Sequence, residues 1–277
     1  MAHCTVTEAE KILDKEFKVL DKGFVRLVDY LGSDERIIQA ARVSYGDGTK
    51  TALQDEALID YLMRQQHTSP FEQVVFTFHL KMPIFIARQW VRHRMARMNE
   101  ILGRLSIMKE EFYVPDIKNI DPQKKDKLER ALEPLEPEEA EKIQKEFKKE
   151  QKRSYEEYKD LIERGLAREI ARINLPLSLY TEFYWQMDLN NLFRFLKLRL
   201  DIHAQLEMRE YAKTILQIVK TVCPVATASF ENVMLKSVTF NGEEINALRK
   251  VLAGETNPLS GKKLDRFLTK VKNGLQL

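Results

Sequence analysis

The clearest hydrophobic pattern in the chain is the alternation within QVVFTFHLK, residues 73–81. Successive side chains of a strand point to opposite faces, so apolar residues at every second position predict a strand with one buried face. The predicted buried face carries Phe76, Phe78 and Leu80, and the opposite face carries Thr77, His79 and Lys81.

Two further segments before this strand have recognisable patterns. FKVLDKGFVRLVDYLG, residues 17–32, predicts two strands joined by a turn at Lys22 and Gly23. SDERIIQAARVSY, residues 33–45, predicts a helix with Ser33 as its N-cap, because a small hydroxyl residue precedes two acidic residues in the first turn.

Helical spacing of apolar residues marks both flanks of the alternating segment. DEALIDYLMRQQH, residues 55–67, carries an apolar stripe at intervals of three and four residues. After the strand, Pro83 suits the first turn of a helix that continues through IFIARQWVRHR, residues 84–94. Strands and helices thus both occur in the first hundred residues.

A segment dominated by Glu and Lys extends from about residue 118 to residue 164. Such a charge run is usually a solvated face, and an interrupted apolar stripe after Pro137 indicates a long exposed helix. The segment does not require a domain boundary. We therefore expect residues 1–277 to form a single domain with this helical insert.

Composition and charge narrow the classes of function. Lys and Arg number 45 against 42 Asp and Glu, so the net field is too small to indicate general nucleic-acid binding. Cys4 and Cys223 lack metal-ligand spacing, and the histidines form no zinc motif. No apolar run approaches the length of a membrane span, and the first residues do not resemble a signal peptide. These features predict a cytoplasmic soluble protein with no metal site.

Local clusters of arginine are the strongest chemical signal. RQWVRHRMARMNE, residues 88–100, falls at or just beyond the end of a predicted helix, where cations are favoured by the helix dipole. The cluster is compatible with a solvated face or with an anion site, because guanidinium groups match phosphate and carboxylate oxygens. Arg168 and Arg172 share a second predicted helix face before Pro176.

Arg199 lies in a third candidate segment, among apolar neighbours. The spacing predicts one continuous helix in which Arg199 and His203 are one turn apart. A guanidinium in apolar surroundings needs a partner or a ligand. Asp201 or Glu207 could be a structural partner, and an anionic or heterocyclic ligand is the alternative.

RHRMARMNEILGR, residues 92–104, resembles the signature of the flavin-dependent thymidylate synthases, in which RHR is followed by NE and then by GR. Further segments are similar to that family in the same order. They are FKVLDKGFVRLVDYLGSDERIIQAARVSY, HTSPFEQVVFTFHLKMPIFIARQW, EFYVP, AREIARINLPLSLYTEFYW and LRLDIHAQLEMREYA. The Glu/Lys-rich segment and the extension over about residues 235–277 match nothing in the resemblance.

The resemblance implies an α+β subunit in which helices surround a mainly antiparallel sheet. It also implies a homotetramer whose active sites lie between subunits. The implied reaction is the reductive methylation of dUMP to dTMP, with methylenetetrahydrofolate as carbon donor, FAD as hydride carrier and NADPH as reductant. No enzyme nucleophile is required, in keeping with the lack of a nucleophile motif.

The resemblance also assigns roles to individual residues. Flavin contacts are implied for His67, Ser69, Arg92, His93, Arg94, Glu100 and His203. Contacts with the nucleotide are implied for Gln89, Arg92, Glu100, Arg104, Arg172 and Arg199. Of these, Arg199 is the implied catalytic residue: it would bond the uracil edge and favour its electron-rich form.

Several positions depart from the family pattern. Leu102 replaces a serine, Leu105 replaces a tyrosine, and Arg97 replaces a residue that is often serine. In a flavin-binding stretch, Asp188, Asn190 and Arg194 stand where asparagine and arginine are common. These departures keep open a flavin- or nucleotide-binding homologue with weak or no synthase activity. An arginine-rich RNA-binding module is a third hypothesis, although aromatic stacking motifs are missing.

Overall fold

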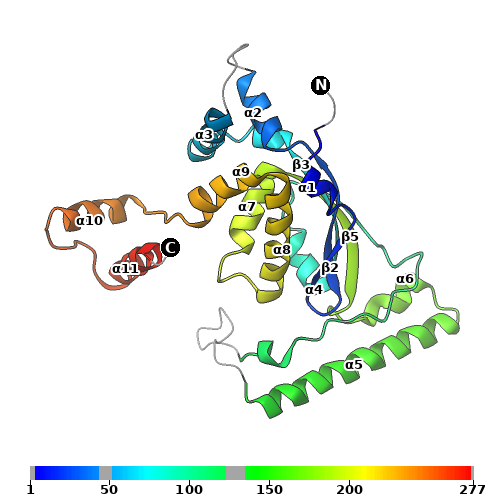
Figure 1. Ribbon diagram of the computed structural model, residues 1–277. Helices are drawn as coiled ribbons and strands as arrows, with labels where there is room; N and C mark the ends of the chain where they lie inside the picture. Colours follow the sequence, from blue (N-terminus) through cyan, green and yellow to red (C-terminus); the bar gives the residue numbers. More distant parts are fainter. Residues whose placement is uncertain (1–3, 44–51, 123–134, 276–277) are drawn as a thin grey trace. The chain divides into compact units, whose positions relative to one another are not determined.

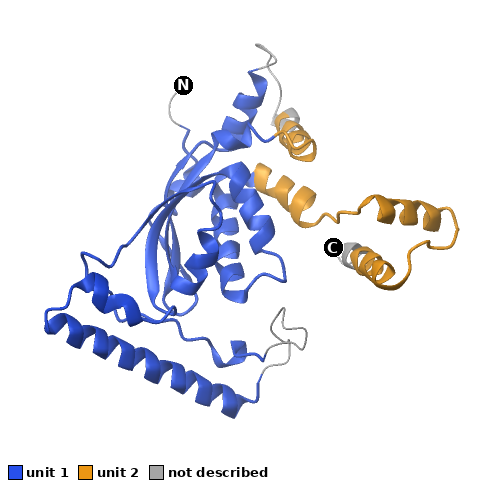
Figure 2. Cartoon of the chain, turned by 180° about the vertical axis from the view of Figure 1, so that it is seen from behind, with its two compact units in different colours: residues 1–49, 68–224 blue, residues 50–67, 225–277 orange. Residues whose placement is uncertain are grey.

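The computed structural model describes residues 4–43, 52–122 and 135–275. The chain clusters into two compact units, one of residues 1–49 and 68–224 and the other of residues 50–67 and 225–277 (Figure 2). The first unit contains the antiparallel sheet, and the second is helical in its described part.

A five-stranded antiparallel sheet, in the order β1-β2-β3-β5-β4, is the centre of the first unit. Its strands are β1 (Glu16–Val19), β2 (Gly23–Leu31), β3 (Val75–Pro83), β4 (Arg97–Glu100) and β5 (Tyr180–Asp188). β1 and β2 pair as a hairpin, with Val19 opposite Gly23, which confirms the predicted turn. β4 lies at an edge and pairs with β5.

The alternating segment forms β3, and its apolar face is fully buried as predicted. Phe78 lies opposite Trp185 of β5 in the register, and the two aromatic rings are in contact in the core. Lys81 was expected on the more exposed face, but it is buried too. Its Nζ lies 2.8 Å from Glu111 Oε2, so the buried ammonium is compensated by an ion pair.

Helices α4, α7 and α8 pack on one face of the sheet (Figure 1). The helices of the first unit are α1 (Thr7–Glu10), α2 (Asp34–Arg42), α4 (Ile84–Trp90), α5 (Pro137–Glu163), α6 (Arg168–Ala171), α7 (Leu189–Arg199) and α8 (Leu206–Val222). Short 3-10 turns are η1 (Phe71–Gln73), η2 (Ile117–Asn119) and η3 (Arg172–Asn174). This mixture of helices and an antiparallel sheet confirms the predicted α+β class.

The predicted boundaries of two helices need correction. α2 begins after Ser33 as expected, but the hydroxyl of Ser33 forms no capping hydrogen bond and instead lies 3.1 Å from Cys4 Sγ. The last residues of that prediction, Ser44 and Tyr45, lie outside the described residues. α4 ends at Trp90 rather than continuing to Arg94, so the arginine cluster begins in its last turn and extends beyond it.

The Glu/Lys-rich segment forms the predicted long helix, α5, and residues 123–134 of the segment lie outside the described part. One stripe of α5 is buried in a small apolar cluster that includes Tyr155, Tyr158, Met108 and Phe112. Tyr155 Oη donates to the carbonyl of Met108, and Tyr158 Oη accepts from the amide of Met108, each at 3.0 Å. The helix therefore fixes the segment that follows the signature.

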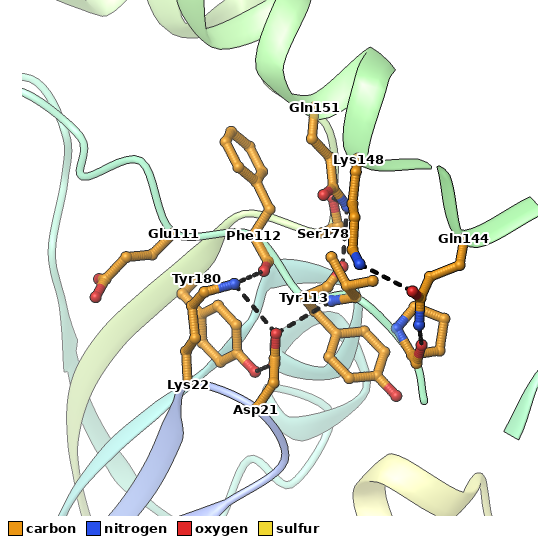
Figure 3. A network of polar contacts seen from close by, with 12 residues as sticks. Asp21, Lys22, Glu111, Phe112, Tyr113, Gln144, Lys148, Gln151, Ser178 and Tyr180 are labelled. Carbon is orange, nitrogen blue, oxygen red and sulfur yellow. Dashed lines mark hydrogen bonds and ion pairs between the residues drawn. The ribbon is translucent and has the colours of Figure 1, made fainter. Parts of the chain in front are cut away.

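A polar network ties α5 to the β1–β2 turn (Figure 3). Asp21 Oδ1 accepts a 2.6 Å hydrogen bond from Tyr180 Oη, and Lys22 Nζ donates to the carbonyl of Phe112 at 2.7 Å. Gln151 of α5 is buried and donates to the carbonyl of Tyr113 at 2.9 Å. Burial raises the pKa of Tyr180, with the nearby Tyr211 and Asp21 adding to the effect, so its hydroxyl stays a donor to Asp21.

The second unit consists of helices joined by polar contacts. They are α3 (Ala52–Arg64), α9 (Pro224–Phe230), the π-helical turn η4 (Glu231–Leu235), α10 (Gly242–Leu252) and α11 (Gly261–Leu275). α3 confirms the helix predicted for residues 55–67, and its Asp60 accepts a 3.0 Å hydrogen bond from Ser229. Glu244 of the α10 capping box lies 2.7 Å from Lys270 of α11.

Among the described helices, none is long and apolar enough to cross a membrane. The prediction of a single domain stays a prediction.

Candidate active site

β4 carries the middle of the arginine-rich signature along the edge of the sheet. Asn99 lies opposite Tyr184 and Glu100 opposite Phe183 in the pairing with β5. The Glu100 side chain accepts a 2.7 Å hydrogen bond from Thr181 Oγ1, which fixes the carboxylate at the strand end. Neither the strand nor Thr181 was predicted, because four mostly polar residues offer no alternation signal.

The loop after β4 is held by the second pair of arginines. Arg168 donates to the carbonyl of Leu105, and Arg172 donates to the carbonyl of Leu102. Arg104 Nε lies 2.8 Å from Glu169 Oε2. The two arginines do not share one continuous helix as predicted, because α6 ends at Ala171 and η3 begins at Arg172. Both nevertheless bind the same loop.

Gly103 gives this loop its tight conformation. Its φ of +58° is in the left-handed region, where side chains with a Cβ are rarely found. A Cβ there would lie 2.5 Å from the sulfur of Met108, the residue that α5 holds in place. Steric constraints alone therefore favour glycine at this position of the signature, independently of any ligand.

Arg199, the last residue of α7, meets the end of α4. Its Nε donates to His93 Nε2 at 2.9 Å, and its Nη2 donates to the carbonyl of Gln89 at 3.4 Å. Burial lowers the pKa of Arg199, and the charge of Arg92 lowers it further. The structure therefore brings Gln89, Arg92, His93 and Arg199 together.

The helix predicted beyond Arg199 is wrong. Asp201 Oδ1 accepts a 2.9 Å hydrogen bond from the amide of His203, and this local turn replaces the helix until α8 begins at Leu206. His203 is exposed and is not one helical turn from Arg199.

Neither of the expected structural partners binds Arg199. Within the described residues Arg199 forms no ion pair with Asp201 or Glu207, and Glu207 instead accepts from Tyr113 Oη at 3.1 Å. Leu198, an apolar neighbour of Arg199 in the sequence, is 56% exposed. In the isolated chain, Leu198 therefore does not shield the guanidinium of Arg199 from solvent.

Several cations of the arginine cluster at residues 88–100 have no carboxylate partner among the described residues. Arg92, Arg94 and Arg97 are exposed, and none forms an ion pair with a carboxylate in the part of the chain that the structure describes. The uncompensated charge is concentrated between α4 and β4. Guanidinium groups that are not neutralised from within are suited to bind an anion.

Comparisons with known proteins agree with this geometry. The family model described as thymidylate synthase complementing protein matches residues 26–225. A flavin-dependent thymidylate synthase of Treponema denticola is 56% identical over 266 residues, which cover 96% of this chain and all of that protein. A flavin-dependent thymidylate synthase of Treponema pallidum is 54% identical, over the whole of this chain and 91% of its own length.

The chain belongs to the flavin-dependent thymidylate synthase family.

A solved relative extends the match to three dimensions. The crystal structure of the UMP/dUMP methylase PolB from Streptomyces cacaoi, bound with 5-Br dUMP, superposes with a TM-score of 0.72 at 29% identity. The match covers 79% of this chain and 99% of that one. The extension that the resemblance left unmatched is also assigned, because residues 238–277 match a thymidylate synthase ThyX C-terminal domain.

Membership in the flavin-dependent thymidylate synthase family confirms the predicted reaction class and the FAD cofactor, with NADPH and methylenetetrahydrofolate as co-substrates. The residues present fit a flavin dinucleotide, since its diphosphate needs cationic donors, and Arg92 and Arg94, which have no carboxylate partner among the described residues, could supply them.

Three residues predicted for flavin contact in this family already have structural roles. Asp188 is the N-cap of α7, where it accepts from the amide of Asn191 at 2.9 Å and from its side chain at 2.7 Å. Asn190 donates to Glu72 at 3.5 Å, and Glu100 is held by Thr181. Arg194 is exposed on α7. If Asp188 contacted the flavin, its carboxylate would have to do so while it also caps α7.

The two remaining predicted flavin residues of the family pattern lie in different units. Ser69 is exposed in the first unit. His67 is exposed in the second unit, where its ring has an edge contact with Tyr61. Sequence reasoning missed Gln205, whose side-chain oxygen accepts from Gln89 Nε2 at 2.5 Å. Its position in the loop before α8, two residues after the predicted His203, is the only signal that could have indicated it.

The synthase chain has a cavity of about 730 Å³ that is separate from these residues. It lies beside the β1–β2 turn and the start of α5, and its lining includes Asp21, Lys22, Tyr113 and Lys148 (Figure 3). None of the predicted site residues lines it.

Proposed function

We propose that this chain converts dUMP to dTMP, with methylenetetrahydrofolate as carbon donor, FAD as hydride carrier and NADPH as reductant. The observation that carries the proposal is the position of Arg199, which is half-buried beside Arg92 and, within the described residues, is bonded only to the neutral acceptors His93 and Gln89. A guanidinium so placed retains its positive charge and can stabilise negative charge that develops on a pyrimidine.

The arginines between α4 and β4 would hold the flavin. Arg92 and Arg94 have no acidic partner in the described residues, so a diphosphate would compensate their charge. When bound, the flavin supplies the hydride that reduces the transferred carbon. The chain's own contribution is to bind and orient the two anionic ligands beside each other.

The loop after β4 would bind the nucleotide phosphate. Arg104 belongs to this loop and Arg172 of η3 contacts it, and each uses only part of its guanidinium in the contacts with Glu169 and the Leu102 carbonyl. A guanidinium has five N–H donors, so both retain donors for a phosphate. Gln89 is close to Arg199 and would contact the base.

We propose that the protein assembles as a homotetramer whose sites lie between subunits. Its support is an apolar surface, here called the loop patch, on the signature loop and the neighbouring α6 and η3. The loop patch consists of Ile101, Leu102, Leu105, Ile170 and Ile173, which are 43% to 80% exposed. Apolar surface gathered beside an open cationic site favours a protein interface.

The loop patch also gives the departures from the signature a function. Leu102 and Leu105 stand where the family has hydroxyl residues, and both side chains are exposed in the isolated chain. In an interface they would be buried against the neighbouring subunit. The nucleotide would then be bound by Arg104 and Arg172 without the missing serine hydroxyl. The cytoplasmic location stays a prediction.

The test is direct assay of purified protein. We expect an absorbance spectrum of bound flavin that is released as FAD on denaturation, and formation of dTMP from dUMP, methylenetetrahydrofolate and NADPH. A protein that binds FAD and dUMP but forms no dTMP would support the weakly active homologue instead. Restoring Leu102→Ser with Leu105→Tyr would then show whether the altered signature is responsible. Adding UMP as a competing substrate measures whether the protein prefers the deoxyribose of dUMP to the ribose of UMP.

Arg92→Ala and Arg94→Ala should each lower FAD occupancy without unfolding the chain, because both side chains are exposed and neither holds a structural ion pair in the described residues. A charge-assisted contact with phosphate contributes about 1.5 to 3 kcal/mol, so the Kd for FAD should rise roughly tenfold to a hundredfold. FAD titration followed by fluorescence measures this. Arg88→Ala, an exposed arginine at the end of α4, is the matched control. Full FAD retention by both variants would contradict the placement.

A further inference from the structure

The hydrogen bond between Arg199 and His93 determines which histidine nitrogen carries the proton. A guanidinium has only donors and stays protonated in proteins. Arg199 Nε–H points to His93 Nε2 at 2.9 Å, so Nε2 must supply a lone pair. The proton of the neutral ring is then on Nδ1, which becomes a fixed donor.

The surroundings of His93 favour this neutral ring. Its ring has an edge contact with Phe195 at a centroid distance of 4.8 Å, and its amide donates to the Trp90 carbonyl at 3.0 Å. Burial, with the charge of Arg199 as the second cause, lowers the pKa of His93 to about 4. The charge of Arg199 is positive, so it opposes protonation of the ring.

We propose that His93 is a positioning residue for Arg199, which it holds through Nε so that the outer edge of the guanidinium is presented to the ligand. Of five N–H donors, one is bound by His93 and one by the Gln89 carbonyl, which leaves three for a substrate. This role rests on the proposed function, in which the ligand at Arg199 is the uracil ring.

A histidine suits this task better than an acid. A carboxylate would hold Arg199 equally well but would neutralise the charge that acts on the pyrimidine. Neutral imidazole holds the guanidinium and leaves its charge intact. Because the arginine side chain loses rotamer entropy when it is ordered, holding it beforehand lowers the cost of ligand binding.

The test compares His93→Asn with His93→Gln. The glutamine amide reaches the position of Nε2, where its oxygen can accept from Arg199, whereas the shorter asparagine amide corresponds to Nδ1. We expect His93→Asn to lower kcat/KM for dUMP by about tenfold to a hundredfold, on the scale of a displaced catalytic group, and His93→Gln to recover most of the loss. FAD content and circular dichroism of the two variants should match.

A background substitution and a spectroscopic measurement complete the test. Arg199→Lys lacks the Nε–H donor, so in that background the two His93 variants should not differ. Nitrogen-15 NMR of histidine-labelled holoprotein, with the His93 signal assigned by its absence in His93→Gln, should show Nδ1 protonated and Nε2 unprotonated at pH 7.

The outcomes separate this inference from the proposed function. Equal dUMP parameters for the Asn and Gln variants, or a ring protonated on Nε2, would overturn it. If the parent forms no dTMP, the same comparison is made with the Kd for dUMP from calorimetry. A weaker Kd in the Asn variant alone, with the Nδ1–H tautomer, would then support the positioning role although the synthase function has failed.

Discussion

Arg199→Ala lowers the turnover of dUMP to dTMP by about a hundredfold to a thousandfold, with FAD content close to that of the parent. The variant loses a half-buried positive charge beside the base, and one such donor stabilises a transition state by roughly 3 to 4 kcal/mol. Flavin binding is largely spared, because Arg92 and Arg94 remain. The measurement is dTMP formation at saturating co-substrates, with FAD content determined separately.

Lys197→Ala is the matched control for this prediction. Lys197 is an exposed cation two residues earlier on α7 and has no part in the proposed site. The Lys197→Ala variant should retain the parent rate. That result would show that loss of a positive charge from α7 is not sufficient to lower turnover. Equal rates for parent and Arg199→Ala would remove Arg199 from the mechanism.

Ile173→Asp dissociates the assembly and abolishes synthase activity. The parent should have a mass of about 130 kDa, four times 32.5 kDa, and the variant should have the mass of a smaller species. Ile173 is 69% exposed in the single chain, so the substitution costs the isolated subunit little. In an interface the carboxylate would be buried without a partner, at a cost of several kcal/mol. Light scattering at micromolar concentration measures the mass.

Leu252→Asp on α10 is the control for general surface effects, because its side chain is 79% exposed and lies outside the loop patch. It should leave the mass and the rate unchanged. A monomeric parent, or an Ile173→Asp variant that keeps the parent mass and activity, would contradict the proposed interface.

The central strand and the long helices could be predicted because their signals are local. β3 alternates over six residues, and the apolar stripe of α5 repeats over several turns. β4 could not be predicted in this way. It exists because Asn99 and its neighbours meet β5 more than eighty residues later, and no periodicity within four residues records that pairing.

The sequence named candidate residues for the site but not the contacts between them. The resemblance supplied Arg199 and His93 as separate ligands of two molecules, whereas the structure shows them bonded to each other. Helical spacing placed His203 beside Arg199 instead, and that was wrong because Asp201 bonds the amide of His203 and ends the helix. A side chain that accepts a hydrogen bond from the backbone amide two residues later can end a helix, and the spacing of apolar residues does not reveal this.

In the described part of the chain, β4 is hydrogen-bonded to a neighbouring strand along one side only, whereas β3 is bonded on both. An edge strand of four residues opens at a lower free energy than the centre of its sheet, so its amide hydrogens exchange with solvent sooner. The enzyme would therefore lose its catalytic geometry on warming before the fold itself melts. In the proposed site, nucleotide and flavin would bind only the closed strand, so by mass action they would make local opening rarer. Bound ligands would thus also stabilise the strand that carries part of their site.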